Sequence, residues 1–342
     1  MASTINGPVI RACSRHVAIR GLMLGAAVAV TMAAWQRTAT AYETSININA
    51  NAYTYVDPQE VEEFITSNAG PLSATRQVNV GTVAPLARAA AAAAANGGSV
   101  AAEVLGRVSG PFEDFGISGV AEVNAGALAS AAVVIDDLVF DGPGASITTE
   151  LLLEVSGFQS VELLTITDGV FAVANNSVRV DVRLTGGNFF SAYGSRIIDG
   201  TKLSGAPEQV QVFDEAAFIG ATFPDTIGFG TFTAPTNVPL TLEIALQLIA
   251  GTSLDRLSSG PALVDGHART QGAFGATVNL PTNGPAFVLG AGESASSASA
   301  GIVDGAWTGT PVSVAVVPLP GGLLLLASAL GLLAGTRYRR VI

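Results

Sequence analysis

Few side chains in this chain of 342 residues have the types and spacing that catalysis requires. Beyond the N-terminal segment the only histidine is His267, in the sequence DGHART, which predicts a solvated loop. A single histidine is not a metal-binding cluster, and sequence alone pairs it with no serine. The chain contains no GxSxG, SxxK or complete phosphate-binding glycine motif. These observations favour a protein that is not an enzyme.

Three aspartates, Asp136, Asp137 and Asp141, follow a strand-like run and flank a Gly-Pro-Gly turn. Adjacent strand residues point to opposite faces, so Asp136 and Asp137 cannot line one cleft without a bulge. A glycosidase needs two carboxyl groups facing each other across a groove, and nothing here requires that. Calcium suits Asp137 and Asp141 better, although no calcium-binding repeat accompanies them. Turn and surface carboxylates are the favoured interpretation.

Three aromatic residues, Phe189, Phe190 and Tyr193, follow a Gly-Gly-Asn turn. Such a group can form a platform for stacking carbohydrate rings. Aromatic residues make up only 6% of the chain, however, and a β core needs large side chains. We therefore favour core positions for these three residues.

The charge distribution excludes one class of partner. All the acidic residues lie between Glu43 and Asp304, where 27 of them outnumber nine basic residues. A surface this acidic repels phosphates, which argues against nucleic-acid binding. It suits a soluble exported protein and attracts cations.

The N-terminus has the three parts of a secretory signal. Arg11, Arg15 and Arg20 precede an uncharged apolar stretch over residues 21–35. The small residues Ala39 and Ala41 then mark a site for signal peptidase, which predicts a signal peptide over residues 1–41. The only cysteine, Cys13, lies inside this segment, so we expect no disulfide and no thiolate chemistry in the mature protein.

The C-terminus, residues 312–342, also has three parts. Val317, Pro318, Leu319 and Pro320 form a rigid tetrapeptide, and an uncharged apolar stretch over residues 321–335 predicts a transmembrane helix. Arg337, Arg339 and Arg340 follow and would stay in the cytoplasm, leaving the preceding domain outside. A plain membrane anchor is one interpretation of this pattern.

The same tripartite order resembles the PEP-CTERM class of bacterial sorting signals, in its VPLPA-CTERM variant. Gly321 stands where the variant usually has alanine. The resemblance implies that an exosortase recognises the segment, removes the helix, and releases the protein or transfers it to the cell surface. It implies an inner-membrane-tethered precursor whose product is at the surface or extracellular.

Residues 42–311 form the predicted ectodomain. Alternation over residues 44–56 predicts a strand. Asp57-Pro58 and the glutamates after it predict a short helix ending near Ser67. The alanine run over residues 85–95 predicts a second peripheral helix, ended by Asn96-Gly97-Gly98.

Residues 99–317 are mostly strand-like, with turn residues at short spacing and no helical pattern between them. We therefore predict an all-β fold, an antiparallel β-sandwich of jelly-roll or Ig-like type. The expected strands cover residues 127–140, 145–158, 161–167, 178–184, 226–233, 240–249, 268–280 and 312–317, and the expected turns include 141–144, 168–169, 175–176, 186–188, 199–200 and 281–284.

Two stretches, residues 129–157 and 279–307, are similar to segments of surface proteins that carry this sorting signal. The resemblance implies a surface β-sandwich without an assigned activity. We expect a structural or adhesive protein of the cell surface or extracellular polysaccharide matrix. A polysaccharide- or calcium-binding module and a carboxylate-dependent glycan-active enzyme are the alternatives.

Overall fold

The computed structural model describes residues 42–54, 60–68, 70–80, 86–111, 122–165, 170–203, 207–256 and 267–314. All the regular elements in these ranges are strands, so no described helix is long and apolar enough to cross a membrane. The strands are β1 (Tyr42–Thr54), β2 (Glu60–Asn68), β3 (Leu72–Val80), β4 (Leu86–Asn96), β5 (Ser99–Pro111), β6 (Glu122–Asp141), β7 (Ser146–Thr165), β8 (Val170–Thr185), β9 (Phe190–Leu203), β10 (Gln209–Ala216), β11 (Asp225–Pro235), β12 (Pro239–Arg256), β13 (His267–Asn279), β14 (Ser294–Ser296), β15 (Ile302–Val303) and β16 (Ala306–Trp307).

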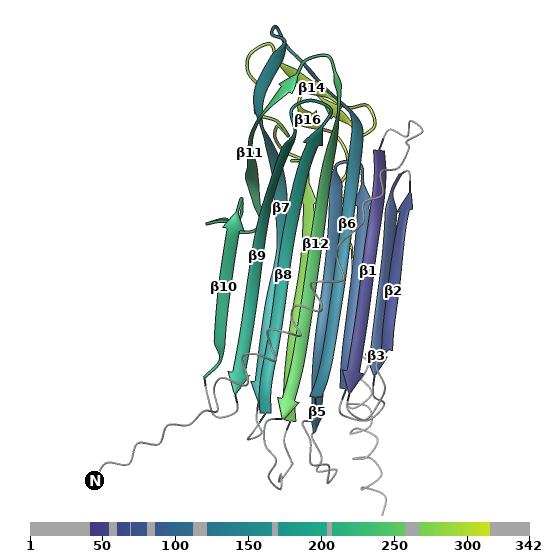
Figure 1. The fold of residues 1–342 in the computed structure, drawn as a ribbon, viewed down its shortest axis with the longest axis vertical. Coiled ribbons are helices and arrows are strands. Elements are labelled where there is room, and N and C mark those ends of the chain that lie inside the picture. Colours follow the sequence, from purple (N-terminus) through teal and green to yellow (C-terminus); the bar gives the residue numbers. More distant parts are fainter. Residues whose placement is uncertain are drawn as a thin grey trace, which may run out of the picture. The chain divides into compact units, whose positions relative to one another are not determined.

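Two antiparallel sheets contain most of the described strands (Figure 1). The first sheet, called sheet A here, has the strand order β10-β9-β8-β12-β6-β1-β2, with the short β14 also paired to β6. The second, sheet B, has the order β11-β7-β13-β5-β4-β3. The described strands therefore confirm the predicted all-β, antiparallel architecture, and their arrangement is that of a β-sandwich.

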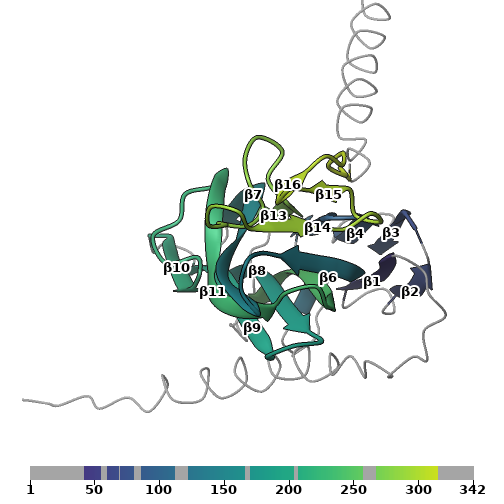
Figure 2. The same ribbon diagram turned by 90° about the horizontal axis from the view of Figure 1, so that it is seen from above.

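The chain crosses between the sheets repeatedly. Strands β5, β6, β7 and β8 alternate between sheet B and sheet A. Later in the chain, β12 inserts between β6 and β8, and β13 inserts between β5 and β7. Seen from above, the two sheets lie as separate layers (Figure 2). Strands distant in sequence are thereby joined, which makes the sandwich depend on long-range pairing.

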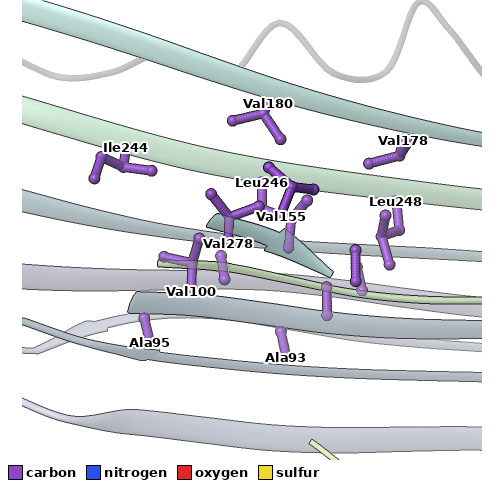
Figure 3. Packing of buried hydrophobic residues seen from close by; sticks show 14 of the residues in the cluster. Ala93, Ala95, Val100, Val155, Val178, Val180, Ile244, Leu246, Leu248 and Val278 are labelled. Atoms are coloured by element: carbon purple, nitrogen blue, oxygen red, sulfur yellow. The ribbon is translucent and has the colours of Figure 1, made fainter. Parts of the chain in front are cut away.

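The core lies between the sheets and follows the period-2 pattern of strands such as β1 and β12. Ile244, Leu246 and Leu248 of β12 point into it from sheet A, and Val100 and Val278 point into it from sheet B (Figure 3). All five are fully buried. A core this continuous stabilises the fold mainly by removing apolar surface from water.

The predicted helix over residues 85–95 is wrong, because this segment is strand β4. Its odd-numbered alanines, from Ala87 to Ala95, are buried in the core, and its backbone pairs with β3 on one side and β5 on the other. Helix propensity is a weak preference that tertiary packing overrides. Gly97-Gly98, expected to end a helix, is instead the two-residue turn of the β4–β5 hairpin.

The predicted helix that ends near Ser67 is also wrong. Residues 60–68 form β2, which pairs with β1 along its whole length. β6 pairs with one edge of β1, and the backbone groups on the other edge find their partners in β2. The expected peripheral helices are thus both strands.

The other predicted strands and turns have different outcomes. The expected strands before residue 300 lie within β1, β6, β7, β8, β11, β12 and β13, apart from their ends. The expected turns at residues 175–176 and 199–200 are wrong, since these residues lie inside β8 and β9. Residues 312–314 are not in a strand, and residues 166–169 and 315–317 are outside the described residues.

Candidate functional site

The residues of the two predicted targeting signals are outside the described residues. These are Ala39 and Ala41 of the signal-peptidase site, Val317, Pro318, Leu319 and Pro320 of the sorting motif, and Arg337, Arg339 and Arg340. The predicted N-terminal signal helix and C-terminal transmembrane helix lie in the same undescribed segments. The last described residue, Val314, is three positions before the motif.

A β-bulge in β6 decides where the paired aspartates lie. Ile135 pairs with Leu242 and Leu138 pairs with Leu240, so Asp136 and Asp137 together oppose one residue of β12. Ile135 and Leu138 are both fully buried, whereas both aspartates are only half-buried. The bulge therefore keeps both carboxylates out of the core.

Asp137 contacts the segment after β13, residues 280–314, which contains β14, β15 and β16 and which we call the closing segment. Its carboxylate accepts hydrogen bonds from the hydroxyl groups of Ser297 and Ser299, the latter at 2.6 Å, and from the Ser299 amide at 3.0 Å. Partial burial by itself raises the pKa of Asp137, but these hydrogen bonds outweigh it and lower the pKa below its ordinary value. The charged carboxylate of Asp137 thus links β6 to residues 297–299 through hydrogen bonds.

Asp141 belongs to a different local structure. Its Oδ1 accepts a hydrogen bond of 2.8 Å from the Gly142 amide, at the start of the β6–β7 turn. The described residues contain no group of three or more His, Cys, Asp or Glu side chains arranged to hold a metal. Calcium binding at Asp137 and Asp141 stays a prediction.

The three aromatic residues near the β8–β9 turn do not share one environment. Phe190 packs into the core against Phe232, with ring centroids 5.0 Å apart, as the core interpretation expects. Phe189 is 71% exposed. Tyr193 lies on the outer face of sheet A with the Arg179 guanidinium 4.8 Å from its ring centroid. The predicted core position is therefore confirmed for Phe190 and wrong for Phe189 and Tyr193, which are the two of the three that a ligand could reach.

His267 was expected in a loop, and the structure places it at the start of β13 instead. Its backbone pairs with Pro111 of β5. Its side chain is outside the described residues.

Sequence reasoning did not find the polar surface on the outer face of sheet A. One row of this face crosses four adjacent strands in register: Asn51 of β1, Gly126 of β6, Gly251 of β12 and Asn175 of β8. A Cβ atom at Gly251 would lie 2.5 Å from Asn175 Oδ1, and one at Gly126 would lie 3.0 Å from Asn51 Oδ1. The two glycines therefore leave space for the asparagine side chains to lie over the sheet.

A second row, four residues further along each strand, continues this surface. It runs from Asn47 through Ser130 and Gln247 to Arg179, whose guanidinium forms a bidentate ion pair with Asp181 at 2.7 and 2.8 Å. We call the six polar residues of these two rows, together with Asn49 between them, the amide face: Asn47, Asn49, Asn51, Ser130, Asn175, Arg179 and Gln247. Amide, hydroxyl and guanidinium groups supply donors and acceptors without an acidic cluster.

The alternation of Asn with Ile and Ala in β1 was visible in the sequence. The partners of these asparagines on β6, β12 and β8 were not, because they depend on register between strands distant in the chain. No protein-family model matches the chain, and no curated protein or solved structure shows significant similarity to it.

Proposed function

We propose that this chain is an exported surface or extracellular-matrix protein, processed by signal peptidase and an exosortase, with a structural or adhesive role and no catalysis. The observation that carries the proposal is the order of the C-terminal parts, namely the Val317–Pro320 motif, the apolar stretch and the terminal arginines. The signal peptide expected at the other end supports export. Exopolysaccharide and envelope components are the partners that such a location offers.

The architecture of residues 42–314 is compatible with this role. Long strands enclose one apolar core, so the fold requires no disulfide to be stable outside the cell. We assign the sandwich to the jelly-roll type rather than the Ig-like type. The support is the winding of the chain: four strands alternate between the sheets, and the later β12 and β13 insert between them.

The intact mass of the protein recovered from the native cell surface or medium tests the processing. We expect loss of the first 41 residues and of the segment beyond about Pro320. A paired Pro318→Ala and Pro320→Ala variant should retain the C-terminal segment and remain in the membrane fraction. Pro311→Ala is the matched control, since this exposed proline precedes the motif, and it should be processed normally. Retention of the segment in the unaltered protein would refute the exosortase assignment.

Polysaccharide binding is the second candidate function, and the amide face favours it. The uncharged amides of this face can exchange hydrogen bonds with the hydroxyl groups of a neutral glycan, and Tyr193 lies beside Arg179 at the border of the same face. Binding of neutral and acidic polysaccharides should be measured by calorimetry, with and without calcium. Combined alanine substitution of Asn51, Asn175 and Gln247 should abolish binding, and Asn79→Ala, on the exposed face of β3, should not.

The same mixtures of protein, calcium and polysaccharide test the two remaining alternatives, a calcium-binding module and a glycan-active enzyme. Calcium binding that depends on Asp137 and Asp141 would support the metal-binding alternative. Release of reducing sugars that depends on Asp136 and Asp137 would support a glycan-active enzyme, since the bulge leaves both carboxylates outside the core.

A further inference from the structure

The two sheets end in four edge strands, which differ in how they are protected against pairing with another chain. Charges, prolines and bulges on an edge prevent such pairing. In sheet B, β11 carries a bulge between Gly228 and Thr231 and ends at Pro235, and β3 carries Arg76 near its centre. In sheet A, β2 has three glutamates among its first four residues. The fourth edge strand, β10, lacks these features over its first five residues.

Residues 209–213 of β10 read Gln-Val-Gln-Val-Phe and pair with β9 without interruption. Val210, Val212 and Phe213 are 49%, 55% and 48% exposed, so both faces of the strand present apolar side chains to solvent. Figure 1 shows β10 at the free edge of its sheet. Among the described strands none pairs with its outer side.

The exposure of the two valines has a structural reason. Val210 pairs with Gly200 of β9, and a Cβ atom at Gly200 would lie 2.6 Å from Val161 of β7, so this face of β10 is the one turned toward sheet B. In sheet B, however, β11 pairs only with residues 146–155 of β7. No described strand of sheet B therefore extends over Val210 and Val212.

Side chains of β9 hold strand β10 in place. Arg196 of β9 forms a bidentate ion pair with Asp214 at 2.6 and 3.0 Å, donates to the Ala221 carbonyl at 2.7 Å, and stacks 4.4 Å from the Phe223 ring centroid. Glu215 accepts a hydrogen bond of 3.0 Å from the Ser195 hydroxyl. Both carboxylates of β10 thus have protein partners, and the strand is preorganised, which lowers the cost of binding.

We propose that β10 is a self-association edge, at which two copies of this chain join their β10 strands antiparallel about a two-fold axis. A register centred on Val212 places Val212 opposite its own copy, Asp214 opposite Val210, and Glu215 opposite Gln209. No carboxylate then faces another, which matters for a chain of formal net charge −11. The four valines of the two strands become neighbours beneath the joined sheets. Such an interface is isologous and closed.

This inference does not depend on the proposed function. Sedimentation velocity of the purified full-length chain should show a monomer–dimer equilibrium. Val212→Lys places two like charges opposite each other and should weaken the dimer by about tenfold or more. Ile65→Lys is the matched control, because Ile65 is 66% exposed on β2, the other edge strand of the same sheet. It should leave the equilibrium unchanged.

Disulfide trapping gives a second measurement, because a covalent bond between the two copies captures even a short-lived dimer. In a Cys13→Ser background, Val212→Cys should form a cross-linked dimer on mild oxidation, and Ile65→Cys should not. A wild-type protein that remains monomeric up to its solubility limit would overturn the proposal. Equal cross-linking of the two cysteine variants, or equal effects of the two lysine variants, would also overturn it.

Discussion

Replacement of Gly98 by alanine tests how the closing segment is attached to the sandwich. Gly98 has a φ of +85° in the β4–β5 turn, and a Cβ atom there would lie 2.7 Å from Trp307 Nε1. The indole of Trp307 is 4% exposed and donates to the carbonyls of Gly97 and Ala300 at 3.2 and 2.9 Å. The added methyl group must displace the indole and weaken both hydrogen bonds.

The expected loss has two parts. Left-handed backbone costs an alanine about 1–2 kcal/mol, and reduced entropy of the unfolded chain returns about 0.4–1 kcal/mol. Losing donors to two buried carbonyls adds about 1–3 kcal/mol. Gly98→Ala should therefore lower the free energy of unfolding by about 1–5 kcal/mol.

Gly220→Ala is the matched control. Gly220 has a φ of +75° and nothing within 4 Å of the position of its Cβ atom, so only the backbone cost applies, about 1 kcal/mol. Urea unfolding should be followed by fluorescence in a Trp35→Phe background, which leaves Trp307 as the only tryptophan. We expect a red-shifted native emission in Gly98→Ala alone. Equal losses of stability and identical native spectra in the two variants would refute the packing argument.

Three further predictions concern Asp137, the ion pair of Arg196 with strand β10, and the alanines of strand β4. The pKa of Asp137 is lowered in the folded state. The stability that its carboxylate contributes is therefore present above the unfolded pKa and is lost as the pH falls through the folded pKa. Urea unfolding at several acidic pH values should show a smaller loss of stability with falling pH for Asp137→Asn than for the unaltered protein. Arg196→Met leaves the half-buried Asp214 carboxylate without its ion pair and should lower the free energy of unfolding by about 1–3 kcal/mol. Thermal unfolding measures this loss, and an unchanged stability would mean that solvent screens the ion pair. Ala91→Leu should cost about 1–3 kcal/mol by overpacking the core, whereas an unaltered melting temperature would contradict the burial of β4.

Much of the strand content could be predicted because long alternating runs have no competing explanation. β6, β8 and β12 show that pattern clearly. The alanine run could not be assigned in this way, because a run of identical residues has no period, and only propensity remained to decide. Propensity favoured a helix, yet pairing with β3 and β5 satisfies the same backbone groups and buries the alanines as well.

The sites were harder to predict than the strands. The partners of Asp137 lie 160 and 162 residues away, and no local pattern relates a bulge in β6 to serines near residue 300. The glycines beneath the amide face were visible in the sequence, but their position opposite Asn51 and Asn175 follows from register alone. Only Asp141 behaves as its local sequence predicts, since it caps its own turn.

The closing segment relates the fold to the proposed processing. Its contacts with the sandwich include the pairing of β14 with β6 and the hydrogen bonds of Ser297 and Ser299 to Asp137. Trp307 also binds the β4–β5 turn, and the Val312 amide donates to the buried Ser99 hydroxyl at 3.1 Å. All of these contacts precede the proposed sorting motif at residue 317. Cleavage after the motif would therefore remove no contact described here. The sandwich has the same described interactions before and after such a cut, which is what release of a folded domain from a membrane-tethered precursor requires.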